Sequence, residues 1–160
     1  MEHIDGRIFG ERNRCFGCGP NHPSGFHLRF RVDGDEVVTE FTPGETHEGV
    51  PTLMHGGLLS TIADEVGAWA LIALRDRFGF TGSMKSRFPR PVRIGQPVEG
   101  RARITKENSR AAYVEVRLLQ AGQECFTSTL TFILLDADSA EQMVGMSMPE
   151  TMRRFFRARS

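Results

Sequence analysis

The chain has 160 residues, of which 39% are hydrophobic and 25% charged, a composition typical of one globular domain and not of a disordered segment. Its 20 basic and 20 acidic side chains give zero net charge, which excludes an electrostatic drive toward nucleic acid or an anionic membrane. Residues 1–14 are polar, and the longest apolar stretch, near residues 66–74, is short and contains glycine. We therefore expect no signal peptide, no membrane partner and a cytoplasmic location.

The first half of the chain predicts an irregular segment followed by a hairpin. Residues 1–25 are rich in glycine, proline and charge and are expected to form an N-terminal strap. Apolar and polar residues alternate over 26–32 and again up to residue 42, with the turn sequence Asp-Gly-Asp at 33–35 between them. Residues 43–54 are expected to form a loop.

The second half predicts one long helix and then more strands. Apolar residues recur at a spacing of three and four from residue 56 to about residue 77, where a helix is expected. The strands expected after it are 83–88, 98–104, 111–120 and 124–135. Residues 136–160 read as a tail with helical parts that docks through Met152, Phe155 and Phe156. This order favours a single α+β domain over residues 1–160, with a curved antiparallel sheet wrapped around one central helix.

Three cysteines are an odd number, which argues against a secreted disulfide scaffold. Cys15 and Cys18 form a Cys-Phe-Gly-Cys-Gly unit that resembles half of a zinc site, but the chain has no second cysteine pair. His22 and His27 could complete it, at an unusual spacing. We prefer a tight turn without metal, and no cofactor is expected.

The most informative motif is His55-Gly56-Gly57, which opens the long helix, with Asp64 nine residues after the histidine. Glycines at a helix start leave backbone N–H groups free to meet a negative oxygen. A carboxylate inside an apolar helix is costly unless it has a partner or a chemical role. The pair predicts an oxyanion site with a base or nucleophile, as in acyl transfer or hydrolysis.

The helical wheel places Asp64 on a second face of the helix, away from its main apolar stripe. This face also carries Ala68, Trp69 and Leu71, so it is expected to be covered, for example by a second subunit. Gly56 and Asp64 lie roughly 12 Å apart along the axis, too far to reach one carbonyl from the same helix. Two antiparallel copies in a two-fold dimer would bring Gly56 of one chain to Asp64 of the other.

These segments, in this order, resemble the hotdog-fold acyl-CoA thioesterases of the 4-hydroxybenzoyl-CoA superfamily, most closely the phenylacetate-pathway branch. The resemblance covers roughly residues 15–135. It rests on the His-Gly-Gly motif with Asp64, on residues 83–92 followed by Gly95, and on the cysteine segment 15–28.

The resemblance implies an acyl-CoA substrate, a homodimer or homotetramer and a set of site residues. Asp64 would be the general base or the nucleophile, and the Gly56 amide would polarise the thioester carbonyl. Thr81, ten residues before Pro91, matches a position that helps hold the water. The positions implied along the substrate path are His55, Gly57, Arg87, Pro89 and Arg90, the arginines being suited to CoA phosphates.

Two points separate this chain from its expected relatives and from competing functions. Several relatives carry an asparagine six residues before the histidine, where this chain has Gly49, so water, His47 or Glu48 could serve instead. Hotdog dehydratases commonly carry a carboxylate five residues before the histidine, where this chain has Val50. A non-catalytic acyl-CoA-binding module and a carrier-protein thioester substrate stay open. Glu65 points about 100° from Asp64 and is expected to be structural.

Overall fold

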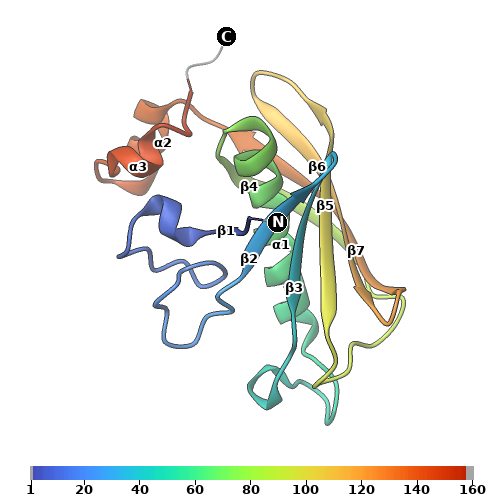
Figure 1. The fold of residues 1–160 in the computed structure, drawn as a ribbon. Coiled ribbons are helices and arrows are strands. Elements are labelled where there is room, and N and C mark those ends of the chain that lie inside the picture. The colour runs from blue at the N-terminus through green and yellow to red at the C-terminus, as the bar shows by residue number, and fades with distance from the viewer. Residues whose placement is uncertain (1, 158–160) are drawn as a thin grey trace.

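The computed structural model describes residues 2–157, in which one antiparallel sheet curves around one long helix (Figure 1). The sheet has seven strands in the order β1-β2-β3-β5-β6-β7-β4. The elements are β1 (Ile4–Asp5), β2 (Arg29–Asp33), β3 (Glu36–Phe41), α1 (Gly56–Arg75), β4 (Gly79–Arg87), β5 (Val98–Glu107), β6 (Ala111–Gln120), β7 (Gln123–Leu134), α2 (Ala137–Val144) and α3 (Glu150–Arg153), with short 3-10 turns at Gly6–Phe9 and Glu45–His47. The predicted architecture, the hotdog fold, is confirmed.

Helix α1 begins and ends at recognisable caps. His55 is the N-cap, and its Nδ1 accepts the N–H of Gly57 at 2.9 Å. The helix ends at Arg75 because Asp76 adopts a left-handed conformation with φ 51° and receives the chain into the turn. Strand β4 then starts at Gly79, four residues earlier than the predicted strand. The apolar periodicity predicted the helix well but did not reveal this early strand start.

The strap differs from the sequence expectation in two ways. Residues 26–28 are not part of a strand, because His27 has a positive φ of 52° and the N–H groups of Phe26 and Leu28 bond to carbonyls of the strap. The strand β2 therefore begins at Arg29, three residues later than the alternation suggested. The strap in turn contributes β1, which pairs with β2 at the sheet edge.

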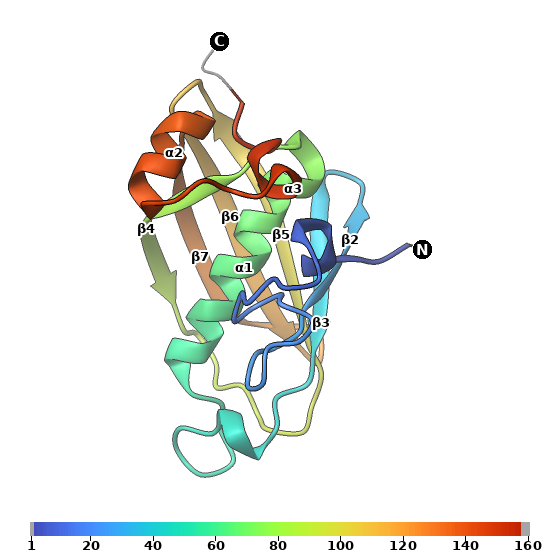
Figure 2. The same ribbon diagram turned by 90° about the vertical axis from the view of Figure 1, so that its left-hand side faces the viewer.

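The core lies between α1 and the concave side of the sheet (Figure 2). Fully buried side chains of α1 include Ile62, Ala63, Val66 and Ala70. Trp69 stacks on Phe30 of β2 with ring centroids 4.5 Å apart. This burial explains why α1, although long and apolar enough to cross a membrane by length and composition, is the core helix of a domain. Helix α1 also extends well beyond the apolar stretch 66–74.

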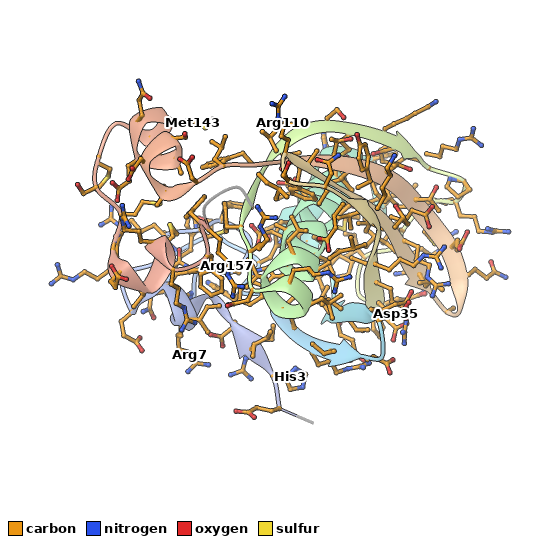
Figure 3. The ribbon with its side chains drawn as sticks, turned by 90° about the horizontal axis from the view of Figure 1, so that it is seen from above. His3, Arg7, Asp35, Arg110, Met143 and Arg157 are labelled. Carbon is orange, nitrogen blue, oxygen red and sulfur yellow. The ribbon has the colours of Figure 1, made fainter. Side chains whose placement is uncertain are left out.

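The tail docks on the end of the domain as predicted. Phe155 and Phe156 are 2% and 5% exposed, and the Phe155 ring meets Phe9 of the strap with centroids 5.4 Å apart. Phe156 packs against Phe78 and Phe80 beside the start of β4. The two ends of the chain therefore close the same end of the core, while Met143 of α2 stays at the surface (Figure 3).

Candidate active site

Asp64 of α1 and Thr81 of β4, two of the site residues that the resemblance implies, lie in contact with each other. The Thr81 hydroxyl donates a hydrogen bond to Oδ1 of Asp64 at 2.5 Å. A β-bulge between Thr81 and Ser83 shifts the register of β4 against β7 next to this contact. Asp64 is partly buried, and burial raises the pKa of its carboxyl, while the hydrogen bond from Thr81 opposes that rise. The pair thus has the geometry of a base held by a hydroxyl.

The N-terminus of α1 offers a second polar feature. Within residues 2–157 the Gly57 N–H is used by the His55 cap, whereas the Gly56 N–H has no hydrogen-bond partner. A cleft of about 550 Å³ adjoins it, and its lining consists of Gly49, Val50, Leu53, Met54, His55, Gly56, Leu59, Phe88, Arg90, Pro91 and Val92. The walls are largely apolar, and a free amide at a helix start is suited to a carbonyl oxygen that gains negative charge.

One chain does not bring these two features together. Gly56 lines the cleft, but Asp64 and Thr81 do not, because eight residues of helix, roughly 12 Å, separate Asp64 from Gly56. His55 lines the cleft too, although its Nδ1 is occupied by the cap, and Gly57 is on the exposed side of the first turn.

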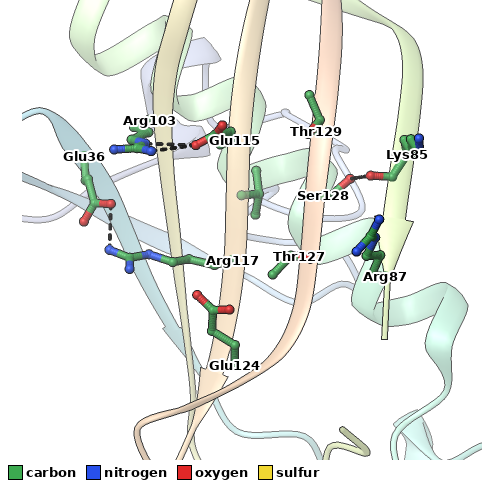
Figure 4. Close-up of a pocket in the computed structure, with 11 residues that line it drawn as sticks. Glu36, Lys85, Arg87, Arg103, Glu115, Arg117, Glu124, Thr127, Ser128 and Thr129 are labelled. Carbon is green, nitrogen blue, oxygen red and sulfur yellow. Dashed lines mark hydrogen bonds and ion pairs between the residues drawn. The ribbon is translucent and has the colours of Figure 1, made fainter. Parts of the chain in front are cut away.

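The three residues implied for the CoA path lie in different places. Arg90 lines the cleft and donates to the backbone oxygen of Glu124 at 2.9 Å. Arg87 lies instead on the outer face of the sheet, in a charged depression of about 550 Å³ that also holds Lys85 (Figure 4). Pro89 is exposed in the segment between them. A single chain therefore presents no continuous path through these positions.

The outer depression is a mixed-charge surface of strands. Arg103 pairs with Glu115 at 2.7 Å, and Arg117 pairs with Glu36 at 2.9 Å. Its other lining residues are Lys85, Arg87, Val116, Glu124, Thr127, Ser128 and Thr129. Because two of its cations are already paired with carboxylates, it lacks the strong positive field that a polyphosphate would need.

The loop before α1 explains why this chain has Gly49 at the position where several relatives carry asparagine. A Cβ added to Gly49 would lie 3.0 Å from Cα of His55, a backbone atom that cannot yield easily. Glu48 and His47 are both used within this loop: Glu48 accepts the N–H of Thr52, and Nδ1 of His47 accepts the N–H of Gly44. Burial also lowers the pKa of His47. An asparagine at this position would therefore need the backbone at His55 to shift by a few tenths of an ångström.

Glu65 is the polar residue whose surroundings the sequence did not reveal. As the wheel indicated, it points away from Asp64, and it meets the strap, where Sγ of Cys15 lies 3.0 Å from its Oε1. Burial raises the pKa of Glu65 to about 8. A hydrogen bond with Cys18, helped by backbone N–H groups of Cys18 and Gly17, lowers the pKa of Cys15 to about 5. The sequence did contain one signal for this contact, because Glu65 is a second carboxylate in an apolar helix and such a group needs a partner.

One family model matches the central part of this chain. The family model for the thioesterase superfamily matches residues 52–126, which include the His-Gly-Gly motif, Asp64 and Thr81. A search of curated proteins found no match.

Similar solved structures share the fold at low sequence identity. A crystal structure of a thioesterase superfamily protein has a TM-score of 0.70 at 18% identity, covering 83% of this chain and 68% of its own. A phenylacetic acid degradation-related protein of Ralstonia eutropha has a TM-score of 0.62 at 23% identity, and the match covers 68% of this chain and 85% of that protein. A hypothetical thioesterase of Streptococcus pneumoniae, solved with coenzyme A, has a TM-score of 0.62 at 15% identity, and the match covers 66% of this chain and 86% of that protein. The family match over residues 52–126 and the shared hotdog fold show that this chain is similar to proteins of the thioesterase superfamily.

Proposed function

We propose that this protein is an acyl-CoA thioesterase, which hydrolyses a thioester to a free acid and CoA. The observation that carries the proposal is the Gly56 amide at the N-terminus of α1, which has no hydrogen-bond partner within residues 2–157 and lies beside a largely apolar cleft. An apolar cleft suits an acyl group, and an unpaired backbone N–H suits the oxyanion of its thioester. Asp64, on the same helix, supplies the carboxylate that such a reaction needs.

The proposed chemistry needs only these groups and water. Asp64 takes a proton from water as the water oxygen attacks the thioester carbonyl carbon, and the Gly56 N–H stabilises the oxyanion that forms. The C–S bond then breaks, and the sulfur leaves with the proton as CoA thiol. In the alternative course Asp64 attacks the carbonyl carbon directly, the C–S bond breaks to release CoA thiolate, and a mixed anhydride forms. Water then hydrolyses that anhydride to the free acid and the restored Asp64 carboxylate, and the proton that the water loses goes to the thiolate. Thr81 holds the carboxylate in either course.

The proposed site is composite, because the two groups are roughly 12 Å apart along one helix. Among the described strands β4 pairs only with β7, so its other edge is open over nine residues. An open edge strand is a common site of chain association. The face of α1 that carries Thr61, Asp64 and Ala68 is only partly buried beside it. Pairing two chains at this side would give a two-fold dimer with two equivalent sites.

Thiol release from a panel of aliphatic and aromatic acyl-CoAs tests the activity. We expect hydrolysis without an added cofactor, and Asp64→Asn should lower kcat by about 10²-fold or more, as removal of a general base does. Glu65→Gln is the matched control, since it changes the neighbouring carboxylate that faces the strap, and it should cost far less. A panel without thiol release but with tight acyl-CoA binding would instead favour a binding module.

Subunit mixing tests the composite site. Gly56→Pro removes the amide donor at the first helical position, where proline is well tolerated and where His55 already has the extended conformation that a following proline requires. Gly56→Ala adds the same Cβ but keeps the N–H. Homodimers of Asp64→Asn and Gly56→Pro should both be nearly inactive.

Mixed dimers of these two variants would hold one intact site and one doubly defective site. Random exchange should then restore about a quarter of the wild-type rate per chain, because half of the dimers carry one good site of two. Absence of recovery, with exchange verified by native mass spectrometry and folding by circular dichroism, would mean that each site is built within one chain.

A further inference from the structure

We propose that Cys15, Cys18 and Glu65 bind one Zn²⁺ ion that ties the N-terminal strap to helix α1. Their three donor atoms, two sulfurs and one carboxylate oxygen, all lie within 4.8 Å of one another. The strap supplies the cysteines and the helix supplies the glutamate, 47 residues further along the chain. The ion would therefore join two segments that are distant in sequence, at the residue next to Asp64.

The spacing of the donors fits a tetrahedral ion. With Zn–S bonds of about 2.3 Å, two sulfurs on one tetrahedral ion lie about 3.8 Å apart, within the observed limit. The sulfur of Cys15 and Oε1 of Glu65 are 3.0 Å apart, so a small outward movement of the carboxylate would admit the ion. Two thiolates and one carboxylate are accepted zinc ligands, and water would take the fourth position.

The local backbone is also shaped to bring the three groups together. A Cβ on Gly17 would lie 2.0 Å from Cγ of Glu65, so only glycine lets the Cys-Phe-Gly-Cys turn sit directly on this carboxylate. Gly19 follows Cys18 and closes the turn by donating its N–H to the carbonyl of Cys15 at 2.8 Å.

The charges around the group leave a place for a cation. Within residues 2–157 no lysine or arginine forms an ion pair with Glu65. Two thiolates and a carboxylate carry three negative charges, which a divalent ion reduces to one. The histidines that the sequence offered as ligands are used elsewhere: Nε2 of His27 bonds to the carbonyl of His22, and Nδ1 of His22 accepts the N–H of Ser24. Glu65 takes their place as the third ligand.

Metal content and cobalt substitution test the proposal on the full-length protein. Protein produced with Zn²⁺ should contain one zinc per chain by elemental analysis. After removal of zinc by a chelator under reducing conditions, Co²⁺ should bind at one per chain and give a thiolate-to-cobalt charge-transfer band. Trp69 is the single tryptophan of the chain and contacts the site, so Co²⁺ should also quench its fluorescence.

Variants assign the ligands. Cys15→Ser and Cys18→Ser should lose stoichiometric metal, and Glu65→Gln should weaken Co²⁺ binding while the charge-transfer band persists. Cys125→Ser is the matched control for Cys18→Ser, because Cys125 is buried like Cys18 but lies on β7 outside the group, and this variant should still bind one ion.

Three results would overturn the proposal. The first is zinc-free wild-type protein that neither takes up Co²⁺ nor gains thermal stability from added Zn²⁺. The second is a thiol count of one per chain in denatured protein purified without reductant, with no metal bound, which would identify a Cys15–Cys18 disulfide instead. The third is equal metal binding by the wild type and by both cysteine variants. Because these measurements do not use turnover, they are independent of the thioesterase proposal.

Discussion

The contact between Thr81 and Asp64 gives a prediction whose size follows from the structure. Thr81→Val keeps the shape of the side chain but removes the hydroxyl that donates to Oδ1 of Asp64 at 2.5 Å. Hydrogen bonds to charged groups are worth about 1.5–3 kcal/mol, and because Thr81 is exposed we use the low end, about 1.5 kcal/mol. The lost bond destabilises the carboxylate relative to the carboxyl, so the pKa of Asp64 rises further.

This rise in pKa should shift the pH profile of kcat/KM, so the loss of rate should depend on pH. A general base works only when ionised, so the rate of the wild type should rise with pH through a midpoint above the usual range of an aspartate, since burial raises the pKa of Asp64. Below the midpoint Thr81→Val should be about tenfold slower, because about 1.4 kcal/mol corresponds to a factor of ten. On the alkaline plateau it should be within a few fold of the wild type.

Acyl-CoA hydrolysis followed by thiol release over a range of pH would measure this shift, with Thr81→Ser as the control that keeps the hydroxyl. An equal loss at every pH, with an unmoved midpoint, would refute the reasoning. In that case Thr81 would act on the water and not through the carboxylate.

Two further predictions concern the loop and the tail. Gly49→Asn, which restores the residue found in several relatives, should lower both activity and stability, because its Cβ would lie 3.0 Å from Cα of His55. The loss of stability should be about 1–3 kcal/mol. The control Gly44→Ala, whose Cβ would have its nearest neighbour at 3.9 Å, should be near neutral in thermal denaturation and turnover. Phe155→Ala should cost about 3–5 kcal/mol in denaturant unfolding, since the ring is 2% exposed in the core, whereas Val144→Ala at 46% exposure should stay within about 0.5 kcal/mol. A small loss for Phe155→Ala would mean that the tail is not part of the cooperative core.

The sequence alone determined those features that depend on neighbours along the chain. Apolar periodicity predicted α1, and alternation predicted β6 over its observed bounds, Ala111–Gln120. The motif at the start of α1 predicted an amide at Gly56 that, among the residues the structure describes, has no hydrogen-bond partner, because glycines and a cap are local properties of a helix terminus. The resemblance supplied Thr81, and the structure places its hydroxyl on Asp64.

Tertiary structure alone decided which distant residues meet. The alternation at residues 26–28 predicted a strand, but pairing with the strap overrode it, and local patterns contain no information about that partner. Arg87 and Arg90 are three residues apart in sequence, yet one lies on the outer sheet face and the other in the cleft. For the cysteine pair the sequence suggested His22 and His27 as further ligands and not Glu65, because Glu65 comes from the helix and only the packing of the strap against α1 brings the three together.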